Sequence, residues 1–148
     1  MTAAGFAARN GLSVILVEKN QRLGRKLGIT GKGRCNLTNR CGLQDLIASV
    51  PTNGRFLYSA LSQFSPEDVM EFFESLGVPL KTERGNRVFP QSDKASDIVS
   101  ALERFVRQSG AEIATGRAEK LLLENGSVRG FELQGGGSVL AGHVILAC

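Results

Sequence analysis

The chain has 148 residues, of which 42% are hydrophobic and 22% are charged, and its formal net charge is +4. This length suits one domain or a piece of a larger one, and the composition argues against a disordered chain. No apolar run approaches the roughly 18 residues of a membrane span, and the first residues do not resemble a signal peptide. We therefore expect a cytoplasmic protein with no membrane partner.

Cysteine and histidine are few and irregularly spaced. The three cysteines are Cys35, Cys41 and Cys148, and His143 is the only histidine. An odd number of cysteines without regular spacing argues against a disulfide framework and suits a reducing compartment. Only Cys35 and Cys41 lie close together, so we expect no metal site.

The first element is expected to be a helix that ends at Asn10-Gly11, followed by a buried strand over Ser13–Glu18. This order is half of a βαβ unit. If the last glycine of a G-x-G-x-x-G motif stood one position before Met1, Glu18 would follow the glycines by about 20 residues, where an acid binds ribose hydroxyls. Ala4 and Gly11 would then fill the later positions of the extended motif. The spacing alone leaves a nucleotide-binding unit and an ordinary αβ unit equally open.

A basic, glycine-rich stretch follows the strand. Residues 18–40 carry seven Lys or Arg against one acid, and residues 24–39, GRKLGITGKGRCNLTN, contain four glycines and four cations. The stretch has no clear helical or strand periodicity. Clustered cations among glycines indicate that this loop meets something anionic.

Three amphipathic helices are expected next. The first spans Arg55–Phe64, the second begins after the cap Ser65 and ends at Gly77, and the third begins near Ser92 or Asp93 and ends at Gly110. Their apolar stripes are expected to lie in the core. These stripes are Leu57, Ala60, Leu61 and Phe64 in the first helix, Val69, Phe72, Phe73 and Leu76 in the second, and Ala95, Ile98, Val99, Leu102, Phe105 and Val106 in the third.

The last third of the chain reads as short strands. The expected strands are 112–115, 118–124, 127–133 and 138–140, with an Asn125-Gly126 hairpin turn, so we expect an antiparallel β-meander at about 117–141. A further buried strand is expected at His143–Ala147.

The sequence GRKLGITGKGRCNLTN resembles the GRKxxxxGxGRCNxTN signature of bacterial FAD-dependent, NAD(P)/FAD-type oxidoreductases, described as aminoacetone-oxidase-like or bile-acid-reductase-like flavoproteins. The resemblance continues through Asn53–Leu61, Phe72–Leu102 and Val144–Ala147. It implies an α/β fold, a partial doubly wound, Rossmann-like FAD-binding domain of the two-dinucleotide-binding-domain type with an added β-meander. Relatives carry a strand and the glycine motif before residue 1 and an inserted domain and closing segment after residue 148, where Cys148 often corresponds to Thr.

The resemblance also implies a cofactor site. Glu18 would bind the adenosine ribose, Lys19 would lie near the adenine, and the loop would run along FAD. Arg25 and Lys26 would face the pyrophosphate and flavin side, and the Ala118 backbone would face the adenine. The implied cofactor-binding set is Glu18, Lys19, Gly24, Arg25, Lys26, Thr30, Gly31, Gly33, Arg34, Cys35, Asn36 and Ala118. NAD(P)H is a possible electron donor, and the substrate is an unknown small molecule.

Two other interpretations remain. Residues 24–36 could bind phosphate or nucleic acid, but no aromatic residue lies between Lys19 and Arg40 to stack on bases, so nucleic acid is disfavoured. The chain could also be a non-functional fragment, because strands at 14–17 and 144–147 without a first strand between them would expose unpaired edges. We therefore expect the isolated chain to bind FAD weakly or not at all. Cys35 is expected to be a buried, inert thiol.

Overall fold

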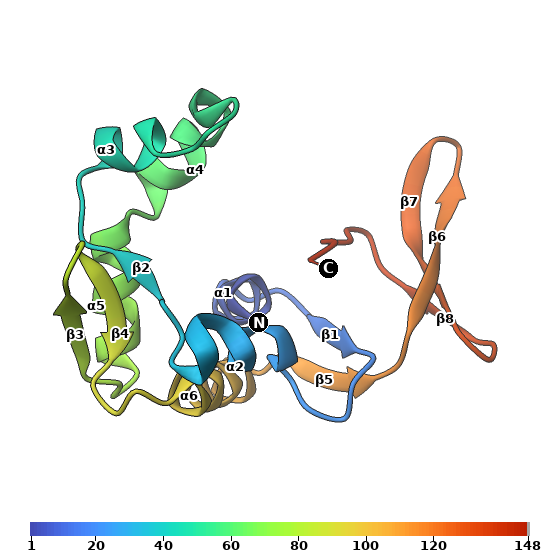
Figure 1. Ribbon diagram of the computed structural model, residues 1–148. Helices are drawn as coiled ribbons and strands as arrows, with labels where there is room; N and C mark the ends of the chain where they lie inside the picture. Colours follow the sequence, from blue (N-terminus) through green and yellow to red (C-terminus); the bar gives the residue numbers. More distant parts are fainter. Residues whose placement is uncertain (148) are drawn as a thin grey trace.

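The computed structural model describes residues 1–147, so the expectation for Cys148 lies outside the described residues. Figure 1 shows a central base from which a helical arm and a β-meander rise toward the same side. The base contains helices α1 (Thr2–Arg9), α2 (Arg25–Ile29), α5 (Pro66–Ser75) and α6 (Ala95–Gln108), the 3-10 turn η1 (Thr30–Gly33), and strands β1 (Ile15–Glu18), β2 (Thr38–Asn39), β3 (Leu80–Glu83), β4 (Arg87–Pro90) and β5 (Glu112–Thr115).

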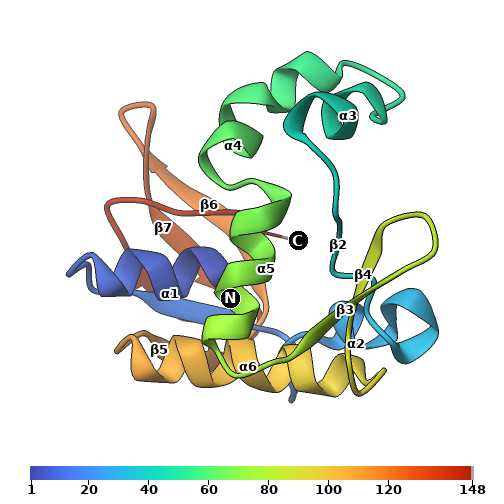
Figure 2. The same cartoon turned by 90° about the vertical axis from the view of Figure 1, so that its left-hand side faces the viewer.

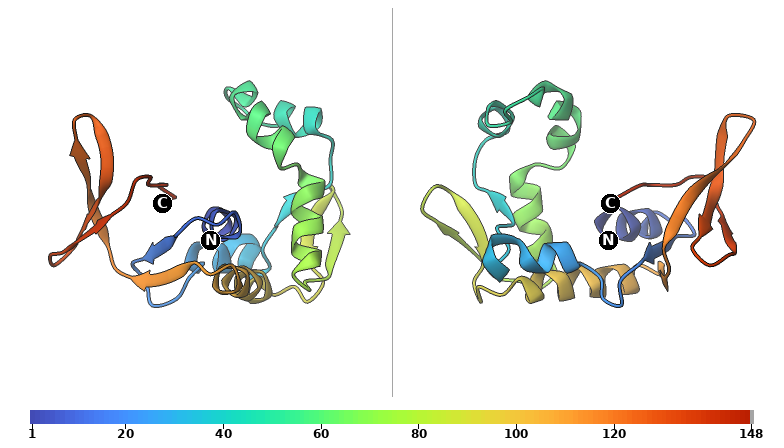
Figure 3. Two further views of the ribbon diagram at one scale, coloured as in Figure 1. Left: turned by 180° about the vertical axis from the view of Figure 1, so that it is seen from behind. Right: turned by 45° about the vertical axis from the view of Figure 1, so that its right-hand side comes forward.

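The arm and the meander complete the fold. The arm, residues 42–64, contains α3 (Leu43–Ala48), the 3-10 turn η2 (Gly54–Leu57) and α4 (Tyr58–Gln63). The meander contains β6 (Ala118–Glu124), β7 (Ser127–Leu133) and β8 (Ser138–Leu140), paired antiparallel in the order β6-β7-β8. Both views in Figure 3 place the arm and the meander at opposite ends of the base.

The Rossmann-like part of the base is a parallel pair of strands. β1 pairs with β5, with Ile15 opposite Glu112 and Glu18 opposite Thr115. Helix α1 precedes β1 and packs against α6, as Figure 2 shows from the side. The contact is close at Gly5, where a Cβ atom would lie 2.1 Å from Phe105 Cε1. The expected order of helix and strand and the expected meander are confirmed, but the strand is not buried as expected, because Ile15 is 45% exposed and the rest of β1 is half-buried.

Helix α6 provides the centre of the core. Ile98, Phe105 and Val106 are 0% exposed, and Leu102 is 4% exposed, as the periodicity predicts, whereas Val99 is only half-buried. Helix α5 begins as expected at Ser65, whose side chain accepts a hydrogen bond from the Asp68 backbone in a capping box. Helix α6 begins at Ala95, later than expected, because Asp93 has a left-handed φ of 58° and cannot continue a helix.

Three expectations are wrong. Residues 141–147 form no strand, and Ile145 and Leu146 are 70% and 68% exposed. Among the described residues only β5 pairs with β1, so this segment has no strand beside it to satisfy its backbone groups. The apolar stripe of 55–64 is not core, since Leu57 and Ala60 are exposed while Leu61 and Phe64 are half-buried. The basic loop is also partly helical, at α2 and η1.

No helix within residues 1–147 is long and apolar enough to cross a lipid bilayer.

Candidate functional site

The first half of the candidate site lies at the carboxyl end of the parallel pair. Glu18 is the last residue of β1, and its Oε1 accepts hydrogen bonds from the Asn20 backbone N–H at 2.8 Å and from Asn20 Nδ2 at 2.6 Å. Asn20 Oδ1 in turn accepts a bond of 3.3 Å from Arg25 Nη1. A short polar chain therefore links the strand end to the start of α2.

The N-terminus of α1 and the start of the meander lie at the same edge. The backbone nitrogen of Met1, which caps α1, lies near the Glu18 carboxylate. A Cβ atom on Gly24 would lie 3.2 Å from the Met1 side chain, and Gly24 has a left-handed φ of 66°. The Gly116 N–H donates to the Glu18 carbonyl at 2.9 Å, which brings Ala118, at the start of β6, to this edge.

The second half of the candidate site is the turn 30–36, whose backbone is mostly left-handed. Gly31, Lys32, Gly33 and Cys35 have φ values of 55°, 57°, 85° and 60°. The Cys35 N–H donates to the Thr30 carbonyl at 3.0 Å and closes the turn. A Cβ atom on Gly31 would lie 2.9 Å from the Asn36 backbone nitrogen, so this turn requires glycine there.

Cys35 fastens the turn to the core. Its side chain is 0% exposed and packs in the cluster that contains Ile98 and Leu102 of α6. Burial raises the pKa of the Cys35 thiol, and a hydrogen bond with Thr30 partly offsets that rise. The thiol is therefore a packing group held in its neutral form, and the predicted contact between Cys35 and a cofactor stays a prediction.

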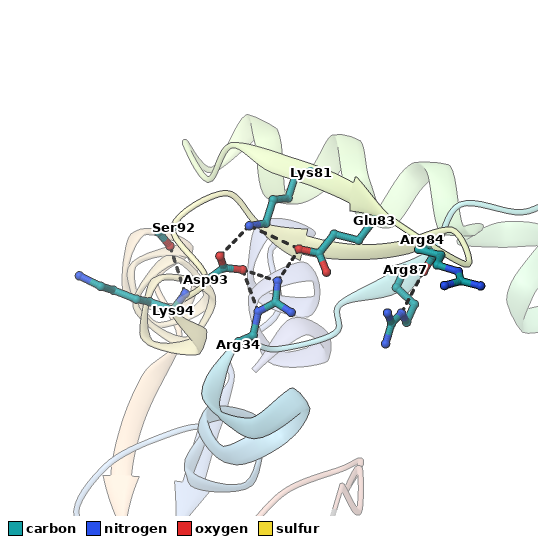
Figure 4. A network of polar contacts seen from close by, with 8 residues as sticks. All are labelled: Arg34, Lys81, Glu83, Arg84, Arg87, Ser92, Asp93 and Lys94. Atoms are coloured by element: carbon teal, nitrogen blue, oxygen red, sulfur yellow. Dashed lines mark hydrogen bonds and ion pairs between the residues drawn. The ribbon is translucent and has the colours of Figure 1, made fainter.

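Arg34 is held by two carboxylates from the β3–β4 hairpin and the loop after it (Figure 4). Its Nη2 lies 2.5 Å from both Glu83 Oε1 and Asp93 Oδ1, and its Nε donates to Asp93 Oδ1 at 2.8 Å. Lys81 Nζ bridges the same two carboxylates, at 2.6 Å from Asp93 and 3.5 Å from Glu83. Hydrogen bonds from Arg34 and Lys81 hold the pKa values of Glu83 and Asp93 below their usual range.

The structure thus divides the predicted site residues into two groups. Glu18, Gly24, Arg25 and Ala118 gather at the carboxyl end of β1, and residues 30–36 lie against β4 and α6, with α2 connecting the two. The side chains of Lys19, Arg25, Lys26 and Lys32 are exposed to solvent. Their contacts with a cofactor stay predictions.

Sequence reasoning missed the partners of Arg34. No element was predicted for Lys81 and Glu83, and Asp93 was considered only as a possible start of the third helix. One signal was present, because Gly85-Asn86 is a pair typical of a two-residue hairpin turn, and both residues have positive φ. That hairpin would have brought residues 80–90 together as neighbouring strands, although not beside the basic loop.

One open hollow in the described part of the chain lies elsewhere. It has a volume of about 440 Å³ and lies where the arm joins the base, lined by Arg40, Cys41, Gly42, Leu43, Ser65, Pro66 and Glu67. None of the predicted cofactor residues lines it.

Comparisons with known proteins agree with this fold. Residues 1–148 match the family model of the HI0933-like protein Rossmann domain. A 3-dehydro-bile acid delta(4,6)-reductase from Clostridium scindens is 37% identical over 152 residues, which covers 100% of this chain and 36% of the relative. A ribosomal RNA dihydrouridine synthase from Escherichia coli is 29% identical over 102 residues, which covers 69% of this chain and 25% of that protein.

A solved structure extends the likeness of fold. The crystal structure of Thermovibrio ammonificans THI4 superposes with a TM-score of 0.60 over 89% of this chain and 42% of that one, at 16% sequence identity. The chain therefore spans well under half the length of the proteins that it matches. Because the family model matches every residue, the chain belongs to the HI0933-like family, of which it forms the Rossmann domain.

Proposed function

We propose that the chain binds the adenosine and pyrophosphate part of FAD at the carboxyl end of β1, within a flavoprotein that reduces a carbon–carbon double bond. The observation that carries the proposal is the meeting of Glu18, Gly24 and the N-terminus of α1 at this one edge. In open parallel sheets such an edge is where ligands bind. A preceding strand and a glycine motif before residue 1 are part of the proposal.

The residues present fit such a ligand. Both bonds from Asn20 go to Glu18 Oε1, so Oε2 can accept from a ribose hydroxyl. The N-terminus of α1 favours negative charge, and the exposed Arg25 and Lys26 supply cations for two phosphates. The exposed backbone of Gly31 and Gly33 permits close approach of the rest of the cofactor along the turn.

The proposed reaction class comes from the two relatives. Their names denote the saturation of a carbon–carbon double bond, in a bile acid in one case and in a uridine of ribosomal RNA in the other. When bound and reduced by NAD(P)H, the proposed electron donor, FAD would supply the hydride for such a reduction. Residues 1–147 bind and orient the cofactor in this proposal, and we assign the substrate contacts to other parts of the protein.

We propose a small unsaturated molecule as the substrate. The basic loop has no aromatic residue between Lys19 and Arg40, and single-stranded nucleic acid is usually held by stacking aromatics among cations. The more similar relative is the one named for a bile acid. The free thiols of Cys35 and Cys41 suit a cytoplasmic location, which is also part of the proposal.

Substitution of Glu18 tests the site. Glu18→Gln removes the charged acceptor for the ribose and is expected to weaken FAD binding about tenfold or more, because hydrogen bonds to a charged group are among the stronger ones. The measurement is the dissociation constant for FAD, from quenching of flavin fluorescence, in the full-length gene product. Riboflavin, which lacks the adenosine, is measured in parallel and is expected to show no change.

A matched control is present at the other end of the same strand pair. Glu112→Gln makes the same chemical change on an exposed residue opposite Ile15, at the amino end of β1 and β5. It is expected to leave FAD binding as it is. Equal losses in the two variants, or an equal loss of riboflavin in Glu18→Gln, would contradict the proposed place of the adenosine.

A further inference from the structure

The turn 30–36 is held from outside by charged residues that the cofactor proposal does not use. Arg34 leaves the turn and reaches Glu83 at the end of β3 and Asp93 in the loop before α6 (Figure 4). Asp93 alone accepts two bonds from Arg34 and one from Lys81. A guanidinium bound through two nitrogens has a fixed direction as well as a partner, so these contacts orient Arg34.

The aromatic ring of Phe89 also contacts the Arg34 side chain. The Arg34 guanidinium carbon lies 4.1 Å from the centre of the Phe89 ring, and Phe89 is only 3% exposed. The same ring faces the turn itself, because a Cβ atom on Gly31 would lie 3.5 Å from Phe89 Cε1. Leu37, just after the turn, donates its N–H to the Val88 carbonyl at 2.8 Å. The β3–β4 hairpin therefore contacts the turn near Gly31, at the Arg34 side chain and at Leu37, just after the turn.

The charges of the cluster balance. Arg34 and Lys81 contribute two positive charges, and Glu83 and Asp93 contribute two negative ones, within contacts of 3.5 Å or less. A cation paired in this way presents little net field to a third group. The positive potential along the loop must then come from the exposed Arg25, Lys26 and Lys32.

We propose that Asp93 is a positioning residue for the cofactor loop: together with Glu83 it holds Arg34 on Phe89 and so keeps the neighbouring Gly31, Lys32, Gly33 and Cys35 in their left-handed conformation. Left-handed residues other than glycine are disfavoured, and Lys32 and Cys35 are two of them, so the turn needs such external support. This inference rests on the proposed function for its effect on FAD, but its effect on the loop itself is independent.

Asp93→Asn is the decisive variant. Asn tolerates the positive φ of this position and keeps the shape of the side chain, so the change removes the charge and leaves the backbone conformation accessible. The first measurement is hydrogen exchange of the peptide 30–36 in residues 1–148 without flavin. We expect exchange on the order of tenfold faster than in the wild type, and unchanged exchange for residues 98–106 of α6.

The second measurement is the FAD dissociation constant of the full-length gene product. We expect Asp93→Asn to weaken binding about tenfold and Glu83→Gln to act in the same direction. Glu103→Gln is the matched control, because Glu103 also pairs with an arginine, Arg107, at 2.8 Å, but on the exposed face of α6. It is expected to change neither exchange of 30–36 nor FAD binding.

Arg34→Lys distinguishes orientation from charge. Lysine keeps the positive charge but cannot bind the two carboxylates and stack as a planar group, so we expect loop exchange as fast as in Asp93→Asn. Wild-type exchange in Arg34→Lys would overturn the role of oriented contacts. Equal behaviour of Asp93→Asn and Glu103→Gln, or weaker FAD binding without faster exchange, would overturn the proposal. Faster exchange in Asp93→Asn with no FAD bound by any protein, the wild type included, would support Asp93 and refute the proposed function.

Discussion

Two helical regions have apolar residues three and four positions apart but differ in what these residues contact. One is helix α6, and the other is the η2–α4 segment of the arm. In α6, Ile98 and Phe105 are fully buried. In the arm, Leu57 and Ala60 of the stripe are exposed, and Phe56 beside the stripe is 80% exposed. A spacing of three and four residues therefore indicates a helix and an apolar face, but burial depends on whether another element covers that face.

The sharpest test of this difference is a pair of phenylalanine truncations. Phe105→Ala is expected to destabilise the chain by about 3–5 kcal/mol, since the ring is fully buried and removal leaves a cavity. The Phe6 and Phe72 rings lie 5.3 Å and 5.0 Å from it in edge-to-face contacts that would also be lost. Phe56→Ala in the arm is expected to change stability by less than about 0.5 kcal/mol. Urea unfolding of both variants gives the two values.

Similar losses for the two variants would mean that the arm is covered in the folded chain and would remove the contrast with α6. The comparison is well controlled, because the residue type and the substitution are the same. The slope of unfolding against urea must also be equal in the two variants, since a changed slope would indicate a changed denatured or native compactness.

A substitution in the opposite direction tests how tightly α1 packs on α6. Gly5→Ala adds one methyl group at a position where a Cβ atom would lie 2.1 Å from Phe105 Cε1. Overpacking of this kind costs about 1–3 kcal/mol and outweighs the gain in helix propensity, about 1 kcal/mol at most. Denaturation midpoints should therefore fall for Gly5→Ala. A raised midpoint would show that α1 can shift on α6 and that the contact is loose.

The sequence predicted those elements whose reasons are local. The cap at Ser65, the Asn125-Gly126 turn and the stripe of α6 each act within one element, and each is confirmed. The strand expected at His143–Ala147 failed because a strand needs a partner, and none of the described residues provides one. Strand β2, with two residues, is too short to show any periodicity.

The candidate site was predictable to a similar extent. The glycine-rich loop was found through its resemblance to a flavoprotein signature, and its contacts with FAD remain predictions. The partners of Arg34 lie 49 and 59 residues away in the sequence, at Glu83 and Asp93, and no local pattern pairs them. The positive φ of Lys32, Cys35 and Asp93 was also not predicted, because these residue types indicate a left-handed backbone less strongly than glycine does.

Lowering the pH should loosen the turn 30–36, which is held by charged contacts, before it loosens the core around α6, which is held by apolar packing. The pKa values of Glu83 and Asp93 are lowered from 4.5 and 3.8 by hydrogen bonds from Arg34 and Lys81. A lowered pKa means that the contribution of these carboxylates is fully present above those ordinary values and is lost as the pH falls through the lower, folded-state values. As the pH falls below these ordinary pKa values, hydrogen exchange of 30–36, corrected for the intrinsic pH dependence, should therefore accelerate before exchange of residues 98–106 does.

In Asp93→Asn most of this acid-induced acceleration should be absent, because the charge that acid removes is already gone. An unchanged acid response in this variant would assign the pH dependence to other carboxylates and leave the turn supported by Phe89 and the buried Cys35.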